Sequence, residues 1–375
     1  VSRARRFGKS HAAGMIDAYY SRGCDSTNLF ENTKIAKNSD YKNYMNKLVR
    51  LFRDNHTSQY MFIKHYETLH ISEPEIREII LDKKQELCLL FYEFPMHSMQ
   101  EPYAPFLGWV RDVYNAYFKN EETPEEFVKN ANVYPLQQEI FSSYIRYGKA
   151  SRKEDIMLVE LQYEKTRLLN SLVNLYQYIG SNKDVFIFIE KLHLANSSCI
   201  HFLYTLMTGE QMKNIKLLAT YNEVYRIPDH IAHVWREFTD EMERRNLQYE
   251  WNSVSIESTV DAQDFFIPNE KNIEEYLHIA VNMYYLLTSN DARYYLERIY
   301  EKIEQDVFKI SQENYIVFME LFSLTLIFEG EYARAVQICD RVGLLGKEMQ
   351  DDRVLYNYNY ISAIAQFGME QLENK

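Results

Sequence analysis

The stretch Asp184–His193, DVFIFIEKLH, decides how the rest of the sequence is interpreted. Five apolar residues in a row, Val185–Ile189, are typical of a strand that is buried on both faces of a sheet. Glu190 follows directly, so the strand would bring its carboxylate to the carboxyl edge of the sheet, where it could hold Mg²⁺. The pattern predicts a magnesium-site strand, and the alternative is an ordinary buried strand with a polar exit.

Strand and helix patterns alternate on both sides of this stretch. Short apolar runs predict further strands at Gln59–Ile63, Glu86–Phe91 and Ile215–Thr220, and Tyr249–Ile256 could add a last one. Because strands alternate with helical patterns, we expect an α/β fold with a parallel sheet and helices on both faces.

The intervening segments carry apolar residues at helical spacing. We expect Ser197 to cap one of these helices, and Gly180 and Gly209 to end two of them. The predicted helices are Pro74–Lys84, Tyr103–Phe118, two within Thr123–Tyr147, Lys153–Ile179 and Ser197–Met207.

The last part of the chain, from about residue 257 to 375, has a different pattern. Apolar positions three or four apart predict an all-α region. Glu329–Ala335 resembles the turn and second-helix start of a tetratricopeptide repeat, in which Gly330 allows the tight turn between helices. One good repeat and two partial ones can be found, so a helical-repeat region and a generic helical bundle both remain open.

The residues around Glu190 resemble a known bacterial family. Glu190–Ser198 is similar to the E-D-L-H-x-A-D-x-S stretch of signal-transduction ATPases with numerous domains, which are related to the AAA+ group. In that family the strand is the Walker B strand of a P-loop fold. The resemblance implies that Glu190 is catalytic and a Mg²⁺ ligand. Lys191 departs from the pattern, because the family has there an acidic residue that helps to activate the attacking water.

The same resemblance extends over about residues 48–251, within a predicted P-loop NTPase-like domain at 48–256. Glu101–Phe106 is similar to the family's P-Y-x-P-F segment, and Ile215–Asn222 is similar to its sensor strand. The resemblance implies that Thr220 or Asn222 binds nucleotide beside the γ-phosphate, and that ATP and Mg²⁺ are the cofactors.

The phosphate-binding loop is missing from its expected place. The family requires GxxxxGK[ST] after the first strand, so that backbone N–H groups can surround the phosphates. This chain has Lys64–Glu75, which contains no glycine and two acidic residues, Glu67 and Glu73, before its end. We therefore expect that this segment does not bind ATP in the usual way.

A second phosphate-binding candidate lies in the N-terminal segment, residues 1–47. Ser2–Ser10, SRARRFGKS, resembles the P-loop of predicted AAA-ATPase-like proteins of gut bacteria. The resemblance implies that Gly8, Lys9 and Ser10 bind nucleotide, with Ser10 also a Mg²⁺ ligand. The alternative is a basic arm leading into a helix, and the strand that normally precedes such a loop is not in the sequence.

Composition limits the classes of partner. A net charge of -12 argues against nucleic acid as a partner. The four cysteines show no CxxC spacing, and no apolar run is long enough to span a bilayer, so we expect reduced thiols, a cytoplasmic location and no membrane contact.

The sequence therefore predicts a signalling ATPase-like protein with eroded motifs and weak or absent hydrolysis. By the family resemblance, ATP and Mg²⁺ at the sheet edge would switch a helical tail that binds protein partners, and a homo-oligomer is possible. The alternative is a non-catalytic protein-interaction scaffold with a helical-repeat tail.

Overall fold

The computed structural model describes residues 34–54, 59–65, 71–81, 87–151, 160–210, 212–223, 225–251 and 265–373. Its centre is a parallel sheet of five strands in the order β2-β3-β4-β1-β5. The strands are β1 Tyr60–His65, β2 Cys88–Glu93, β3 Val185–Glu190, β4 Ile215–Asn222 and β5 Gln248–Trp251. All of the predicted strands are present, which confirms the α/β fold.

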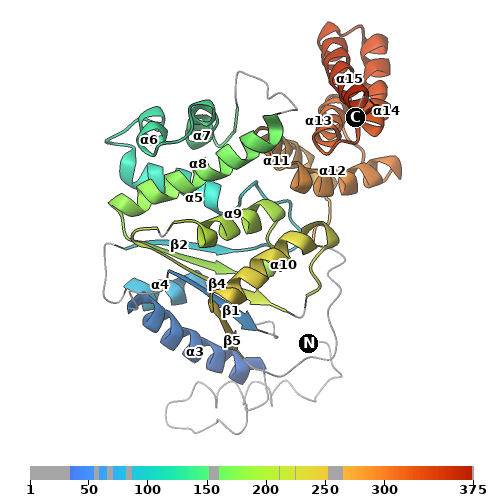
Figure 1. Cartoon of the computed structure of the whole chain (residues 1–375). Coiled ribbons are helices and arrows are strands. Elements are labelled where there is room, and N and C mark those ends of the chain that lie inside the picture. Colours follow the sequence, from blue (N-terminus) through green and yellow to red (C-terminus); the bar gives the residue numbers. More distant parts are fainter. Residues whose placement is uncertain are drawn as a thin grey trace, which may run out of the picture.

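Helices cover both faces of this sheet, as Figure 1 shows. On one face lie α3 Lys34–Asp54 and α4 Glu73–Leu81, and on the other lie α8 Leu161–Asn182, α9 Ser197–Thr208 and α10 Asp229–Arg244. Alternate residues of β3 point to opposite faces of the sheet. Phe186 and Phe188 pack with α3 and α4, whereas Ile187 and Ile189 pack on the other face of the sheet. A strand that is buried on both faces has to be apolar throughout, which explains the sequence of β3.

The connection from β2 to β3 carries three further α-helices before α8. These are α5 Phe106–Val113, α6 Pro124–Asn130 and α7 Pro135–Tyr147. The predicted helix Tyr103–Phe118 begins later than expected, at Phe106, and its last turn, Tyr114–Phe118, is a π-helix. Pro105 immediately precedes the helix, and a proline fits best at or before the first turn.

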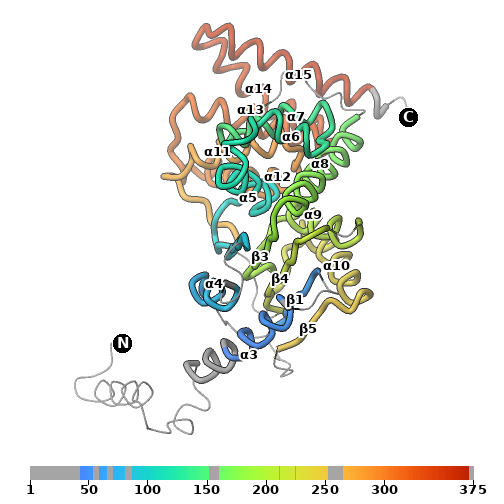
Figure 2. Tube along the Cα trace, turned by 90° about the vertical axis from the view of Figure 1, so that its left-hand side faces the viewer, coloured from blue at the N-terminus to red at the C-terminus, as the bar shows by residue number. Residues whose placement is uncertain are grey.

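The last part of the chain is a helical unit, residues 273–373. It consists of α11 Ile273–Tyr285, α12 Ser289–Glu304, α13 Gln312–Phe328, α14 Tyr332–Met349 and α15 Asp352–Glu373. Helix α13 packs against both α11 and α15, and Figure 2 shows α14 and α15 at the end of the molecule away from α3 and β5. This confirms the predicted all-α region. Gly330 has the left-handed φ of 81° that the turn between α13 and α14 requires.

A regular spacing links alternate helices of this unit, α12 with α14 and α13 with α15. Side-chain hydrogen bonds join three pairs of residues that are 37 positions apart. They include Arg334 Nη1 to Glu297 Oε2, Arg341 Nη2 to Glu304 Oε2 and Asn357 Nδ2 to Glu320 Oε1, at 3.0, 3.1 and 3.1 Å. Contacts at one constant separation are what stacked helical repeats produce.

Two predicted helix signals are wrong. Gly180 does not end its helix, since α8 continues to Asn182. A tertiary contact explains the glycine at this position, because a Cβ on residue 180 would lie 2.2 Å from the carbonyl oxygen of Lys213. The cap of α9 is Asn196 rather than Ser197, and its side chain accepts a hydrogen bond from the backbone N–H of Cys199.

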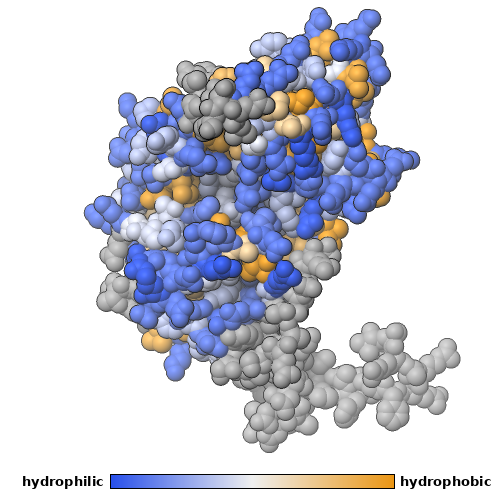
Figure 3. All heavy atoms as spheres, turned by 45° about the vertical axis from the view of Figure 1, so that its right-hand side comes forward, coloured by the Kyte–Doolittle hydropathy of each residue, from blue (hydrophilic) through white to orange (hydrophobic). Residues whose placement is uncertain are grey.

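The surface is mostly hydrophilic on the face that Figure 3 shows, with apolar residues in small, separate groups. None of the helices in the described part of the chain is both long and apolar enough to cross a bilayer. Cys88, Cys199 and Cys339 are free and buried, as expected for reduced thiols, and Cys24 lies outside the described residues.

Candidate functional site

The predicted site lies at the carboxyl edge of the sheet, where β3 and β4 end side by side. Glu190 is the last residue of β3, and Thr220 and Asn222 are among the last three residues of the neighbouring strand β4. Since Phe188 and Leu218 face α3 and α4, strand alternation places Glu190 and Thr220 on that same face. The structure therefore brings together three of the residues that the sequence singled out.

Glu190 already has a backbone partner inside the protein. Its side chain is fully buried, and its Oε1 accepts a hydrogen bond of 2.9 Å from the backbone N–H of Ile71. Ile71 lies just before α4, where a nucleotide-binding loop would join its helix. The carboxylate therefore anchors the start of α4, a structural role that an exposed Mg²⁺ ligand would not have.

The lysines at this edge are paired with carboxylates of the same chain. Lys191, which follows Glu190, forms an ion pair with Glu93 at the end of β2. Lys64, near the end of β1, lies 2.9 Å from a carboxylate oxygen of Glu223. Neither ammonium group is positioned as the phosphate-binding lysine of a P-loop, because each neutralises an acidic neighbour.

Thr220 carries a buried hydroxyl at this edge. It is completely buried, and its Oγ1 has no hydrogen-bond partner among the described residues. A buried hydroxyl without a partner is costly, so such groups often mark a site that a water or ligand completes.

His193 joins the ends of β3 and β4. Its Nδ1 accepts a hydrogen bond of 3.1 Å from the backbone N–H of Asn222, and its ring stacks on Tyr225 with 4.9 Å between centroids. Burial, together with smaller contributions from His65 and Lys191, lowers the pKa of His193 to about 3. The imidazole is therefore neutral at pH 7, with Nδ1 as the acceptor.

The remaining predicted ligands cannot be placed. Gly8, Lys9 and Ser10 lie outside the described residues. Within the described ranges, no group of three or more His, Cys, Asp or Glu side chains is arranged to hold a metal ion. Glu190 is already hydrogen-bonded to Ile71. The described residues of the sheet edge therefore do not by themselves fit a Mg²⁺ site.

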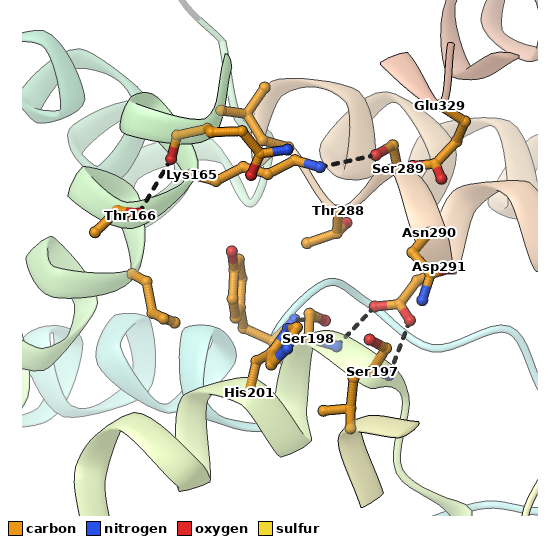
Figure 4. A pocket seen from close by; sticks show the side chains of 15 residues that line it. Lys165, Thr166, Ser197, Ser198, His201, Thr288, Ser289, Asn290, Asp291 and Glu329 are labelled. Carbon is orange, nitrogen blue, oxygen red and sulfur yellow. Dashed lines mark hydrogen bonds between the residues drawn. The ribbon is translucent and has the colours of Figure 1, made fainter. Parts of the chain in front are cut away.

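A second candidate site lies between the sheet and the helical unit. A cavity of about 420 Å³ is bounded by α8, α9 and α10 on one side and by the start of α12 and the end of α13 on the other. Its polar lining residues include Lys165, Ser198, His201, Asp291 and Glu329 (Figure 4). We call this cavity the inter-unit pocket.

Asp291 connects the two sides of the inter-unit pocket. Its carboxylate oxygens accept hydrogen bonds of 2.8 and 3.0 Å from the backbone N–H groups of Ser197 and Ser198, at the start of α9 (Figure 4). Asp291 itself lies in the first turn of α12. Its carboxylate thus satisfies unpaired donors of one helix from the other, and its negative charge suits the amino end of α9.

Burial changes the pKa values of ionisable groups around this pocket. It raises the pKa of Asp291 to about 6, although the hydrogen bonds from Ser198 and Ser197 act in the opposite direction. It also lowers the pKa of Lys165 and of His201. Lys165 donates a hydrogen bond of 3.2 Å from Nζ to Ser289 Oγ on α12.

The inter-unit pocket was not predicted from the sequence. Asp291 is 94 residues away from Ser197, and an acidic residue in the first turn of a helix is common for local reasons. The useful signal would have been Ser197–Ser198 at the start of α9, two donors that need an acceptor from elsewhere in the fold.

No protein family model, curated protein or solved structure matches this chain.

Proposed function

We propose that the chain is a regulatory, ATPase-like signalling protein related to the AAA+ group, with weak or absent ATP hydrolysis. The parallel sheet supports this proposal, because β3 and β4 lie side by side and end at the same edge. The resemblance implies that β3 is the Walker B strand and β4 the sensor strand. Here Glu190 ends the strand in the Walker B position, and Thr220 and Asn222 lie at the end of the strand in the sensor position.

The topology also supports a ligand site at this edge. The helix that follows β1, α4, lies on one face of the sheet, and the helix that follows β4, α10, lies on the other face (Figure 1). Neighbouring strands whose connections go to opposite faces leave a crevice at their carboxyl ends, where open α/β sheets bind ligands. Thr220, with its buried hydroxyl, lies at this place.

The observation that carries the proposal of slow or absent hydrolysis is the hydrogen bond from Ile71 N–H to the buried Glu190 carboxylate. To ligate Mg²⁺ or orient a water, Glu190 would have to give up this bond. Lys191, in the position of the family's second acidic residue, is positively charged and paired with Glu93. Neither residue is arranged to activate a water molecule.

The proposed nucleotide contacts follow the resemblance. Gly8, Lys9 and Ser10 would supply the phosphate contacts if the N-terminal segment reaches the sheet edge, with Ser10 also on Mg²⁺. Thr220 or Asn222 would contact the γ-phosphate. A cytoplasmic location and a homo-oligomeric state are also part of the proposal.

A second candidate function is a non-catalytic protein-interaction scaffold, and the helical unit favours it. The constant 37-residue spacing between α12 and α14 and between α13 and α15 is typical of a stacked helical array, and it is longer than the period of about 34 residues in tetratricopeptide repeats. Along α15, three aromatic side chains lie on one exposed stripe: Tyr356, Tyr360 and Phe367. Aromatic residues are enriched where proteins bind partners.

Calorimetric titration of the full chain with ATP and Mg²⁺ separates the two functions. Saturable binding in the micromolar range that is lost on Lys9→Ala, but not on the control Lys119→Ala, supports the nucleotide switch. Thr220→Val should weaken the same binding, because it removes the buried hydroxyl while keeping the shape of the side chain. Absence of binding contradicts the switch and supports the scaffold.

A further inference from the structure

We propose that the inter-unit pocket binds a small zwitterion with an apolar side chain, of the class of a free amino acid or a dipeptide. The proposal concerns a site away from the sheet edge, so it does not depend on nucleotide binding. It rests on the size of the pocket, on the distribution of charge over its walls and on its position between two structural units.

The size and position are those of a ligand site. Small-molecule pockets measure about 300–1,000 Å³ and occur preferentially where structural units meet. At about 420 Å³, the inter-unit pocket has room for one amino acid or a dipeptide. It is bounded by helices of the sheet layer and of the helical unit, so a bound molecule would contact both.

The pocket is lined by side chains of both charges, which come from different helices. Figure 4 shows Lys165 reaching from α8 toward Ser289, while Asp291 and Glu329 belong to α12 and to the end of α13. Lys165 is not within ion-pair distance of either acid among the described residues, and the side chain of Glu329 has no ion pair or hydrogen bond there, although its backbone N–H donates to Thr325. A ligand with both a carboxylate and an ammonium group would pair with groups of both charges at once.

The hydrogen-bonding capacity of these groups is only partly used. Lys165 has three N–H donors, and its described hydrogen bond, to Ser289 Oγ, uses one of them. The lowered pKa of Lys165 comes mainly from burial, which is the cost that a ligand carboxylate would offset. The carboxylate of Glu329, for its part, can accept hydrogen bonds from a ligand ammonium group.

Apolar side chains also line the pocket. They are those of Leu169, Val234 and Leu287. A branched aliphatic side chain can bury its surface there, contributing about 25 cal/mol per Å². L-leucine and the dipeptide glycyl-L-leucine are therefore suitable probes, since each combines two opposite charges with such a side chain.

The test is calorimetry of the full chain with three probes of nearly the same shape. L-leucine carries both charges, isopentylamine carries only the ammonium group, and 4-methylpentanoate carries only the carboxylate. We expect L-leucine or glycyl-L-leucine to bind, and each single-charge analogue to bind at least about tenfold more weakly. Each single-charge analogue leaves either Lys165 or Glu329 without a partner. An analogue that binds as tightly as leucine overturns the proposal.

Variants locate the binding. Lys165→Met and Glu329→Gln should each weaken binding about tenfold or more, whereas the exposed controls Lys119→Met and Glu301→Gln should leave it within about twofold. Circular dichroism and the unfolding temperature establish that each variant is folded, and the analogue series on the unaltered chain gives an independent result. Absence of binding for both zwitterions up to about 10 mM overturns the proposal, as does binding that Lys165→Met leaves unchanged.

Discussion

The two polar regions of this protein, the sheet edge and the inter-unit pocket, use their charged residues differently. At the sheet edge, Glu190 accepts a backbone N–H, Lys191 pairs with Glu93, and His193 accepts the N–H of Asn222. In the inter-unit pocket, Lys165 and Glu329 both line a cavity and are not paired with each other. Position in the fold therefore does not decide activity: the edge lies where open α/β sheets bind ligands, but its charged groups are used for structure.

The largest expected effect concerns Asp291. Asp291→Ala leaves the backbone N–H groups of Ser197 and Ser198 buried without acceptors, which should cost about 3 kcal/mol of unfolding free energy. Asp291→Asn retains one acceptor and should cost about half as much. Urea denaturation measures both, with the exposed Asp240→Ala as the control. Equal stability of Asp291→Ala and the control would contradict the role of Asp291 in joining α12 to α9.

A smaller loss is expected for Glu190. Glu190→Ala removes the acceptor for Ile71 N–H and should lower the unfolding free energy by about 2 kcal/mol, whereas Glu93→Ala, at a partly exposed ion pair, should lower it by less than about 1 kcal/mol. Amide exchange of Ile71 should become faster in Glu190→Ala alone. Unchanged exchange at Ile71 would mean that Glu190 is free for another ligand.

The two regions should respond to acid in opposite directions. The pKa of His193 is lowered to about 3 from its ordinary 6.5, so the stability it contributes is complete above pH 6.5 and is lost as the pH falls toward 3. The pKa of Asp291 is raised to about 6 from 3.8, so its contribution increases as the pH falls through 6 and is complete below 3.8.

Denaturation at pH 7 and pH 5 tests these signs. His193→Asn should reduce the loss of stability between pH 7 and pH 5 by about 2 kcal/mol. The reason is that the part of this interval below pH 6.5, about 1.5 pH units, lies between the unfolded and folded pKa values of His193. Asp291→Asn should make the loss on acidification larger, because the compensating carboxyl is gone. His201 and His230 also have lowered pKa values and act equally in all variants. Identical pH dependence in His193→Asn and the unaltered chain would refute the assignment.

The smallest effect concerns α8, the helix that links the two regions. It has Lys165 near its start and Gly180 near its end. Gly180→Ala should destabilise the protein by about 1–2 kcal/mol, because the new Cβ would meet the carbonyl oxygen of Lys213. The matched control is Gly108→Ala in α5, where no atom lies within 4 Å and alanine should be neutral or slightly stabilising. Thermal unfolding compares the two, and an equal response would contradict the close packing.

The sequence was sufficient to predict the strands and most of the helices, because their patterns are local. A continuous apolar run such as Val185–Ile189 has few interpretations other than a buried strand. Gly180 was misinterpreted because its reason for being glycine is a contact with Lys213, outside its own helix. The cap of α9 was misassigned by one residue because Asn196 and Ser197 are both good capping residues.

The candidate sites were less predictable. The positions of Glu190, Thr220 and Asn222 follow from the strand pattern, but the hydrogen bond between Glu190 and Ile71 depends on how α4 meets the sheet. The inter-unit pocket brings together Lys165, Ser198 and Asp291, which are widely separated along the chain. Such groups come together only through tertiary packing, and no local pattern encodes it.

The most direct test of the account is steady-state ATP turnover by the full chain with Mg²⁺, measured together with Glu190→Gln and Lys9→Ala. Because the Glu190 carboxylate anchors the start of α4 and Lys191 is paired with Glu93, we predict turnover far below about 1 s⁻¹ that neither substitution changes. Turnover at an ordinary enzymatic rate of about 10 s⁻¹, abolished by either substitution, would contradict the account.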